Sequence, residues 1–190
     1  MNTVCTHKWV VFKLCCKAGI PFRGLVHDLS KFLPTEFWES VKYYQGTSSP
    51  IVAAKKANGY SKAWLHHKGR NKHHPEYWND PRSKIPRPIM PYKYTVEMVC
   101  DTLAAGLVYN GKNWKKESQL EYWEKEKGRS PLNDNLKEFL TEVYMQVSEK
   151  GIDPVITSHN LKKLYKKHTY PGKSAPSGLF RAAAFSLSRP

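Results

Sequence analysis

The sequence has few acidic residues, no CxxC pair of cysteines and no long apolar run. None of its apolar stretches approaches the ~20 residues that cross a membrane. The stretch from Trp9 to Cys16 is interrupted by Lys13 and lacks the small-residue cleavage site of a signal peptide. We therefore expect no membrane partner and a cytoplasmic location. The four cysteines are expected to be buried free thiols.

The shortage of acidic side chains leaves a large excess of positive charge. Lys and Arg number 31 against 16 Asp and Glu, so the formal net charge is +15. Such a surface attracts anions, and we expect a phosphorylated small molecule, a nucleotide or a short nucleic acid as partner. The charge alone does not say which of them is converted. A basic protein without an anionic ligand is the alternative.

Alternating strand patterns and internal repeats are missing, whereas helical periodicity is common. Apolar spacing, prolines and glycines predict helices over Asn2–Lys17, Pro21–Phe32, Thr35–Gly46, Ile51–Lys56, Tyr60–His67, Thr95–Val108, Glu117–Lys127, Asn133–Lys150 and Ser158–His168. The five prolines from Pro75 to Pro91 predict a long irregular crossover. The expected fold class is all-α.

Two of these helices lead to specific expectations about side chains. In the helix from Pro21, the residues Arg23, His27 and Lys31 are four apart and would share one face. The helix that Thr35 caps would bury its large apolar side chains, Phe37, Trp38, Val41 and Tyr44.

Length and composition predict one packed domain. The chain has 190 residues, of which 40% are apolar and 13% aromatic, enough for a hydrophobic core. Residues 171–190 show no clear periodicity. We expect a helical domain over residues 1–170 and a C-terminal tail or extension over 171–190.

Histidines gather in the first half of the chain, near acidic residues. The adjacent pair His27 and Asp28 stands between His7 and two histidine doublets, His66-His67 and His73-His74. Imidazole and carboxylate are ligands for divalent ions such as zinc, iron, manganese and nickel, and carboxylate also suits magnesium. The pattern predicts one or two divalent metal ions. Asp28 is the natural candidate to bridge two of them.

The order of His7, His27-Asp28 and Asp101 resembles the HD superfamily of metal-dependent phosphohydrolases, whose ligands come from separate helices of an all-α core. The run HDLSK from His27 is similar to binuclear members, including the cyclic-dinucleotide phosphodiesterases, which add histidines before the final Asp. A closer resemblance is to small HD-like proteins of unassigned activity in bacteria and phages, with HDLSKF, an EF step, HHxxxNxHHPEYW and a late EMxxD. This chain has all four motifs between His27 and Asp101, and the resemblance covers roughly residues 5–125. If a phage encodes the chain, the expected location is the host cytoplasm.

The resemblance implies an HD-domain-like helical bundle and a set of metal ligands. The implied ligands are His7, His27, Asp28, His67, His73, His74 and Asp101. Within the doublets we favour His67 and His73, followed by His74 and then His66, because one ring of an adjacent pair usually points elsewhere.

Several other side chains are candidates for catalysis or substrate binding. Asp28, Lys31 and Glu36 are the candidate catalytic residues, and Arg23, Lys31, Asn71 and Trp78 are the candidate substrate-binding residues. For Lys31 the alternative is a salt bridge with Asp28 alone. For Trp78 it is aromatic packing, and for Glu36 a solvated position at the start of a helix.

Together these observations predict a metal-dependent phosphohydrolase of the phosphodiesterase or nucleotidase type. Its substrate would be a nucleotide, a cyclic nucleotide or a related phosphoester. One alternative is a nucleic-acid-binding protein with a structural metal site, in which Lys162, Lys163, Lys166 and Lys167 contact phosphates. Another is an HD-type di-iron oxygenase, whose ligand set is nearly the same.

Overall fold

The computed structural model describes residues 2–46 and 49–170, and these form ten α-helices and three 3-10 helices without a strand. The predicted all-α fold is confirmed. The predicted tail at 171–190 lies outside the described residues. The elements are α1 (Asn2–Lys17), α2 (Pro21–Val26), η1 (Leu29–Phe32), α3 (Pro34–Lys42), α4 (Pro50–Asn58), α5 (Lys62–Arg70), η2 (Pro75–Trp78), α6 (Tyr92–Asn110), η3 (Gly111–Asn113), α7 (Ser118–Glu126), α8 (Asp134–Lys150), α9 (Ile152–Val155) and α10 (Ser158–Thr169).

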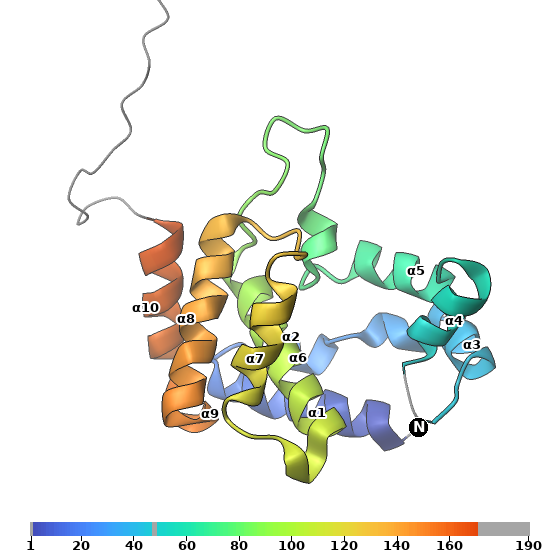
Figure 1. Ribbon diagram of the computed structural model, residues 1–190, viewed down its shortest axis with the longest axis horizontal. Coiled ribbons are helices and arrows are strands. Elements are labelled where there is room, and N and C mark those ends of the chain that lie inside the picture. Colours follow the sequence, from blue (N-terminus) through green and yellow to red (C-terminus); the bar gives the residue numbers. More distant parts are fainter. Residues whose placement is uncertain (1, 47–48, 171–190) are drawn as a thin grey trace, which may run out of the picture.

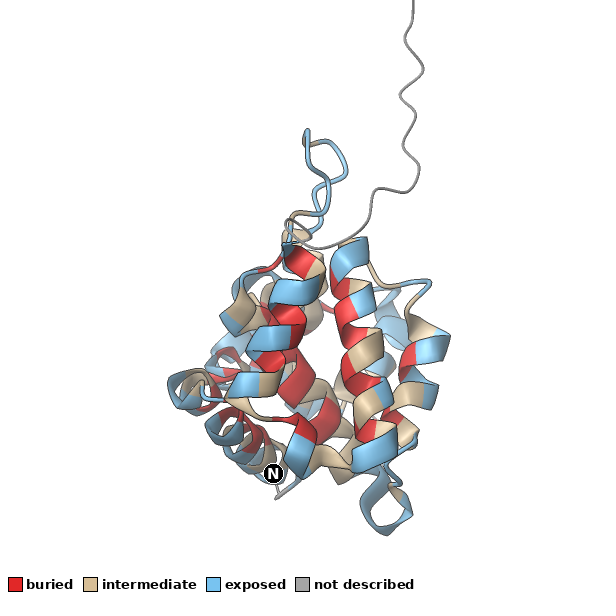
Figure 2. Ribbon diagram, turned by 90° about the vertical axis from the view of Figure 1, so that its left-hand side faces the viewer, coloured by how far each residue is buried: buried red, intermediate tan, exposed pale blue. Residues whose placement is uncertain are grey.

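The apolar helix α6 lies in the middle of the molecule. It contacts α1 and α2 on one side and α7 and α10 on the other, and α8 packs between α7 and α10 (Figure 1). Buried residues line the inward sides of these helices (Figure 2), among them Val11, Leu103, Phe139 and Leu161. Burying this apolar surface is the main favourable term that holds the helices together.

Helix α2 packs very closely on α1 because residue 24 has no side chain. A Cβ atom placed on Gly24 would lie 2.7 Å from Cβ of Cys15 and 2.9 Å from Cα of Phe12. Contacts this short are not tolerated, so glycine is required at the crossing. The close crossing fixes α1 relative to the segment that follows α2.

The predicted continuous helix from Pro21 to Phe32 is wrong. Helix α2 ends at Val26, His27 is extended (φ −53°, ψ 128°) and Asp28 adopts the left-handed conformation (φ 52°, ψ 29°) before η1 begins. Asp is one of the few residues that enter this region at moderate cost. The predicted shared face of Arg23, His27 and Lys31 therefore does not form.

Helices α3, α4 and α5 form a separate layer, in which α3 contacts both α4 and α5 (Figure 1, right). The predicted buried face of α3 is wrong, because all four side chains expected inside are exposed, with Trp38 at 65% and Val41 at 53%. The buried residue of α3 is Glu36. Its carboxylate meets His66 and His67 of α5, so the inward side of this helix is polar.

The predicted proline-rich crossover is irregular after η2, as expected, and projects from the top of the molecule in Figure 1. Trp78 anchors its start by packing against the core and donating a hydrogen bond from Nε1 to the carbonyl of Lys72 (2.7 Å).

In the described part of the chain, no helix has the length and apolar character that crossing a membrane requires.

Candidate metal centre

Seven His and Asp side chains from distant parts of the sequence meet at one place, which we call the candidate centre. It consists of His7 on α1, His27 and Asp28 between α2 and η1, His67 on α5, His73 and His74 between α5 and η2, and Asp101 on α6. These are the seven metal ligands that the sequence predicted. His66 lies outside the groups that could hold an ion, in line with its last place among the doublets.

The break after α2 explains how two consecutive residues reach the same place. In a continuous α-helix, neighbouring side chains point about 100° apart. The extended His27 and left-handed Asp28 remove this constraint, and their side chains converge, with His27 Nε2 3.3 Å from Asp28 Oδ2. A strained backbone at such a position is typical of functional sites.

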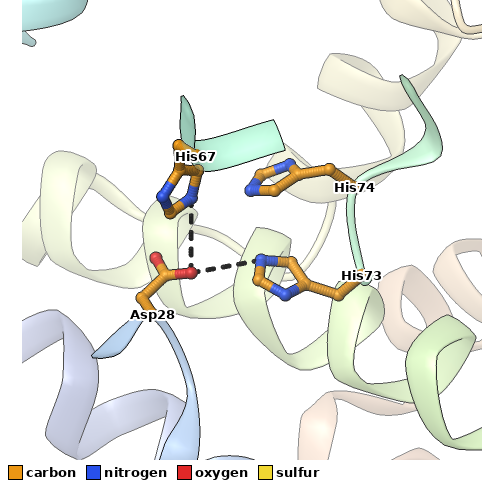
Figure 3. Close-up of side chains that lie close together, drawn as sticks. All are labelled: Asp28, His67, His73 and His74. Atoms are coloured by element: carbon orange, nitrogen blue, oxygen red, sulfur yellow. Dashed lines mark ion pairs between the residues drawn. The ribbon is translucent and has the colours of Figure 1, made fainter. Parts of the chain in front are cut away.

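The carboxylate of Asp28 faces two different sets of imidazole nitrogens. Its Oδ2 lies toward His27, whereas its Oδ1 lies 3.3 Å from Nε2 of His67 and 3.4 Å from Nε2 of His73. Figure 3 shows the rings of His67, His73 and His74 turned toward one space beside this oxygen. Asp28 thus stands between two groups of nitrogen donors.

Each group has the composition of a site for one divalent ion. In the first, atoms of His7, His27 and Asp101 lie within 4.8 Å of one another, and in the second, atoms of Asp28, His67, His73 and His74 do so. Asp101 Oδ1 is 2.9 Å from His7 Nε2 and 3.4 Å from His27 Nε2. A donor set of imidazole and carboxylate without thiolate suits manganese, iron, nickel or zinc.

Several of these buried atoms have no hydrogen-bond partner among the described residues. They include Nε2 of His27, Oδ1 of Asp28 and Nε2 of His73 and His74. Leaving a buried polar atom unpaired costs about 1–3 kcal/mol, so four at one place need an explanation. Divalent ions held by these same atoms would satisfy them, and the residues present therefore fit a metal.

Two buried glutamates hold the imidazoles from behind. Glu97 Oε1 accepts a hydrogen bond from Nδ1 of His27 (3.1 Å). It also lies 3.3 Å from Nδ1 of His73, but this pair does not form a hydrogen bond. Glu36 Oε2 accepts from His67 Nδ1 (2.7 Å). A carboxylate on Nδ1 fixes the tautomer in which Nε2 is free to bind a metal. Atoms of His27, His73 and Glu97 also lie close to one another. We interpret Glu97 as the support of the two imidazoles, because Nε2 of both rings faces the candidate centre.

Glu97 is the functional residue that sequence reasoning missed. It was visible as part of the EMxxD motif, but no role was assigned to it. The available signal was a carboxylate in the middle of an apolar helix, four residues before Asp101 and so on the same face. A fully buried charge of this kind needs partners, and Glu97 has three of them in His27, His73 and Arg23.

The electrostatics favour ionised carboxylates. Burial opposes the charge of Asp28, but Lys31 and His27 outweigh it and hold the pKa of Asp28 well below its usual value. Burial likewise opposes the charge of Glu97, but the hydrogen bond from His27 and the close imidazole of His73 lower the pKa of Glu97 to about 2. Burial and then the neighbouring His73 lower the pKa of His74 to about 3, which keeps its ring neutral and able to bind a metal.

The remaining predicted site residues fall into two groups. Lys31 is beside the candidate centre, with Nζ 2.7 Å from Asp28 Oδ2, a contact that the turn of η1 provides in place of the predicted helix. Arg23 instead binds Oε2 of Glu97 through Nε (2.7 Å). Asn71 donates to Ser30 and to the carbonyl of His67, so it supports α5, and Trp78 packs against the core.

Comparison with known proteins places the chain in a family without giving it an activity. A family model described as a family of unknown function (DUF5662) matches residues 1–146, which include every member of the candidate centre, Glu36 and Glu97. No curated protein and no solved structure matches the chain. With more than three quarters of its length covered by the family model, the chain belongs to the DUF5662 family.

Proposed function

We propose that the chain is a metal-dependent phosphohydrolase of the HD type, whose candidate centre holds two divalent ions. The observation that carries this proposal is the position of Asp28. Its Oδ2 faces Nε2 of His27, whereas its Oδ1 faces Nε2 of His67 and His73, and a carboxylate shared by two ions would need such contacts on both oxygens. Buried nitrogens without hydrogen-bond partners on both sides of it support the same conclusion.

Divalent ions at such a centre supply a nucleophile by lowering the pKa of water, and they neutralise the charge of a phosphoryl group. The chain itself provides a further cation. Lys31 retains 35% side-chain exposure while its ammonium group contacts Asp28. It can therefore bind a phosphoryl oxygen next to the candidate centre and stabilise the charge that develops there.

Glu36 contributes by positioning rather than by contact with substrate. Its two oxygens are bound to His66 Nδ1 (2.6 Å) and His67 Nδ1 (2.7 Å), and its side chain is buried. The catalytic role predicted for Glu36 thus becomes a role in orienting His67. The substrate in this proposal is a nucleotide, a cyclic nucleotide or a related phosphoester, which the strongly basic surface attracts.

The test is metal analysis of the purified chain together with a phosphoester hydrolysis screen in manganese, iron and nickel. We expect two ions per chain and turnover that a chelator abolishes. His7→Ala and His67→Ala should each remove one ion, because they belong to different groups. The exposed His159 provides the matched control, since His159→Ala should keep both ions and full activity.

Two results would reject the proposal. Oxygen consumption with iron, without hydrolysis of any phosphoester, would favour the di-iron oxygenase. Full metal content without turnover, combined with steeply salt-dependent binding of nucleic acid, would favour the nucleic-acid-binding protein.

A further inference from the structure

A second feature of the molecule is a cavity of about 340 Å³ between α6 and α7, one helical turn from the candidate centre. Asp101 of the candidate centre, Ala105 and Tyr109 are four residues apart and share one face of α6, and the last two line the cavity. The distance along the helix from Asp101 to Ala105 is about 6 Å. A molecule bound at the candidate centre can therefore extend into this cavity.

The walls of the cavity are aromatic. Tyr109, Trp114 and Tyr122 line it, and the two tyrosines are 69% and 57% exposed, so the cavity is open to solvent. Aromatic rings bind flat molecules by stacking or by edge-to-face contact. Its volume lies in the range of about 300–1,000 Å³ that is typical of small-molecule sites.

The cavity also contains polar groups, one of them buried and without a partner among the described residues. Gln119 is only 2% exposed and lines the cavity, so its amide is held at the cavity wall. The buried Nε1 of Trp114 has no partner among the described residues. A buried polar group of this kind is costly unless a ligand or water pairs with it.

The absence of a side chain at residue 106 keeps these polar groups accessible. A Cβ atom on Gly106 would lie 3.1 Å from Oε1 of Gln119 and 3.2 Å from Nε1 of Trp114, so both atoms converge over this glycine. An amide offers a donor and an acceptor side by side, and the indole offers a second donor. The edge of a heteroaromatic ring such as a nucleobase has the complementary pattern.

We propose that this cavity is a subsite for a planar heteroaromatic group of the nucleobase class, bound between the aromatic walls and hydrogen-bonded by Gln119 and Trp114. As a subsite of the substrate it rests on the proposed function, since the phosphoryl group of the same molecule would occupy the candidate centre. The cavity, rather than the metal ligands, would then decide which phosphoesters are bound well.

The test compares substrates with and without a base, using the full chain loaded with manganese. The probes are the four common ribonucleoside 5′-monophosphates and glycerol phosphate. Ala105→Leu fills the cavity and Gln119→Leu removes the amide. Each should raise KM for at least one nucleotide about tenfold, the scale of one or two lost hydrogen bonds, and change kcat/KM for glycerol phosphate less than about twofold. Ala53→Leu, the same change at a half-buried position of α4, is the control for folding.

The outcomes separate the subsite from the proposed function. If nucleotides and glycerol phosphate are both hydrolysed and neither variant changes KM for any nucleotide, the subsite is wrong and the hydrolase stands. If no phosphoester is hydrolysed, calorimetry with the four free nucleosides decides. If a nucleoside binds to the unaltered chain and to Ala53→Leu but not to Ala105→Leu, the result supports the subsite without the hydrolase. If no nucleoside binds to the unaltered chain, the subsite is wrong.

Discussion

The candidate centre and the C-terminal helices bury opposite kinds of side chains. The centre encloses His27, Asp28 and His73 with Glu97 behind them, whereas the inward side of α8 consists of apolar residues such as Phe139, Leu140 and Val143. Burying charges costs free energy unless each is paired, and burying apolar groups gains it. One end of the core therefore holds paired polar groups that could bind metal, and the other end is apolar and stabilises the fold.

The largest effect should come from Asp28, which lies between the two groups of candidate ligands. We expect Asp28→Ala to lower phosphoester hydrolysis at least about 1,000-fold and to remove most bound metal, because a bridging carboxylate serves both ions. Metal analysis and steady-state kinetics measure these losses. The exposed Asp134 at the start of α8 provides the control, and Asp134→Ala should keep both. An Asp28→Ala chain with full metal occupancy would show that Asp28 does not bridge.

Truncating a buried side chain in the C-terminal helices should lower stability and leave the metal content unchanged. Phe139 is fully buried on α8, and Phe139→Ala should cost roughly 3–5 kcal/mol of unfolding free energy because it leaves a cavity. Denaturant unfolding measures this cost. Metal content of the folded fraction should stay unchanged. A variant that loses metal while still folded would mean that the two regions are coupled.

Lys31 tests the substrate side of the candidate centre. We expect Lys31→Met to lower kcat/KM about 100-fold, the scale for one positioned charge, with metal content nearly unchanged. The control is Lys162→Met on the exposed side of α10, which should change kcat/KM little. Loss of metal from the Lys31 variant would instead assign Lys31 to a structural ion pair with Asp28.

Glu97 tests the support behind the imidazoles. Glu97→Gln keeps the shape but loses the charge that holds His27, His73 and Arg23, and we expect metal affinity to fall about 10- to 100-fold. Titration with a competing chelator measures the affinity. Glu138→Gln, at an exposed position of α8, should leave it unchanged. Equal affinities in the two variants would contradict the orienting role of Glu97.

The smallest effect is expected on the exposed side of α3. Val41→Ser should change the free energy of unfolding by less than about 0.5 kcal/mol, because this side chain is already largely in water. Val143→Ser on α8, at a fully buried position, should cost several times more. Equal destabilisation in thermal or chemical unfolding would mean that the face of α3 is covered in solution.

The helical class, most helix positions and the seven members of the candidate centre followed from the sequence. The helix Asn2–Lys17 has the predicted ends, and Asn133 and Thr157 cap α8 and α10 close to the predicted starts. These features depend on local signals, namely apolar spacing, caps and prolines, which act within a few residues. The predicted ligand set followed from the HD resemblance, because its motifs retain their order in the sequence.

Only the tertiary structure decided how these residues meet. Asp tolerates the left-handed conformation, but the local pattern of the sequence did not predict a break at this position. The broken backbone brings Asp28 into contact with His67 and His73, which are distant in the sequence. The exposure of Trp38 and the burial of Glu36 depend on where α5 packs. The spacing of apolar residues within α3 does not contain this information. The sequence thus indicated which residues form the candidate centre. Long-range packing and the need to pair buried charges decided their geometry.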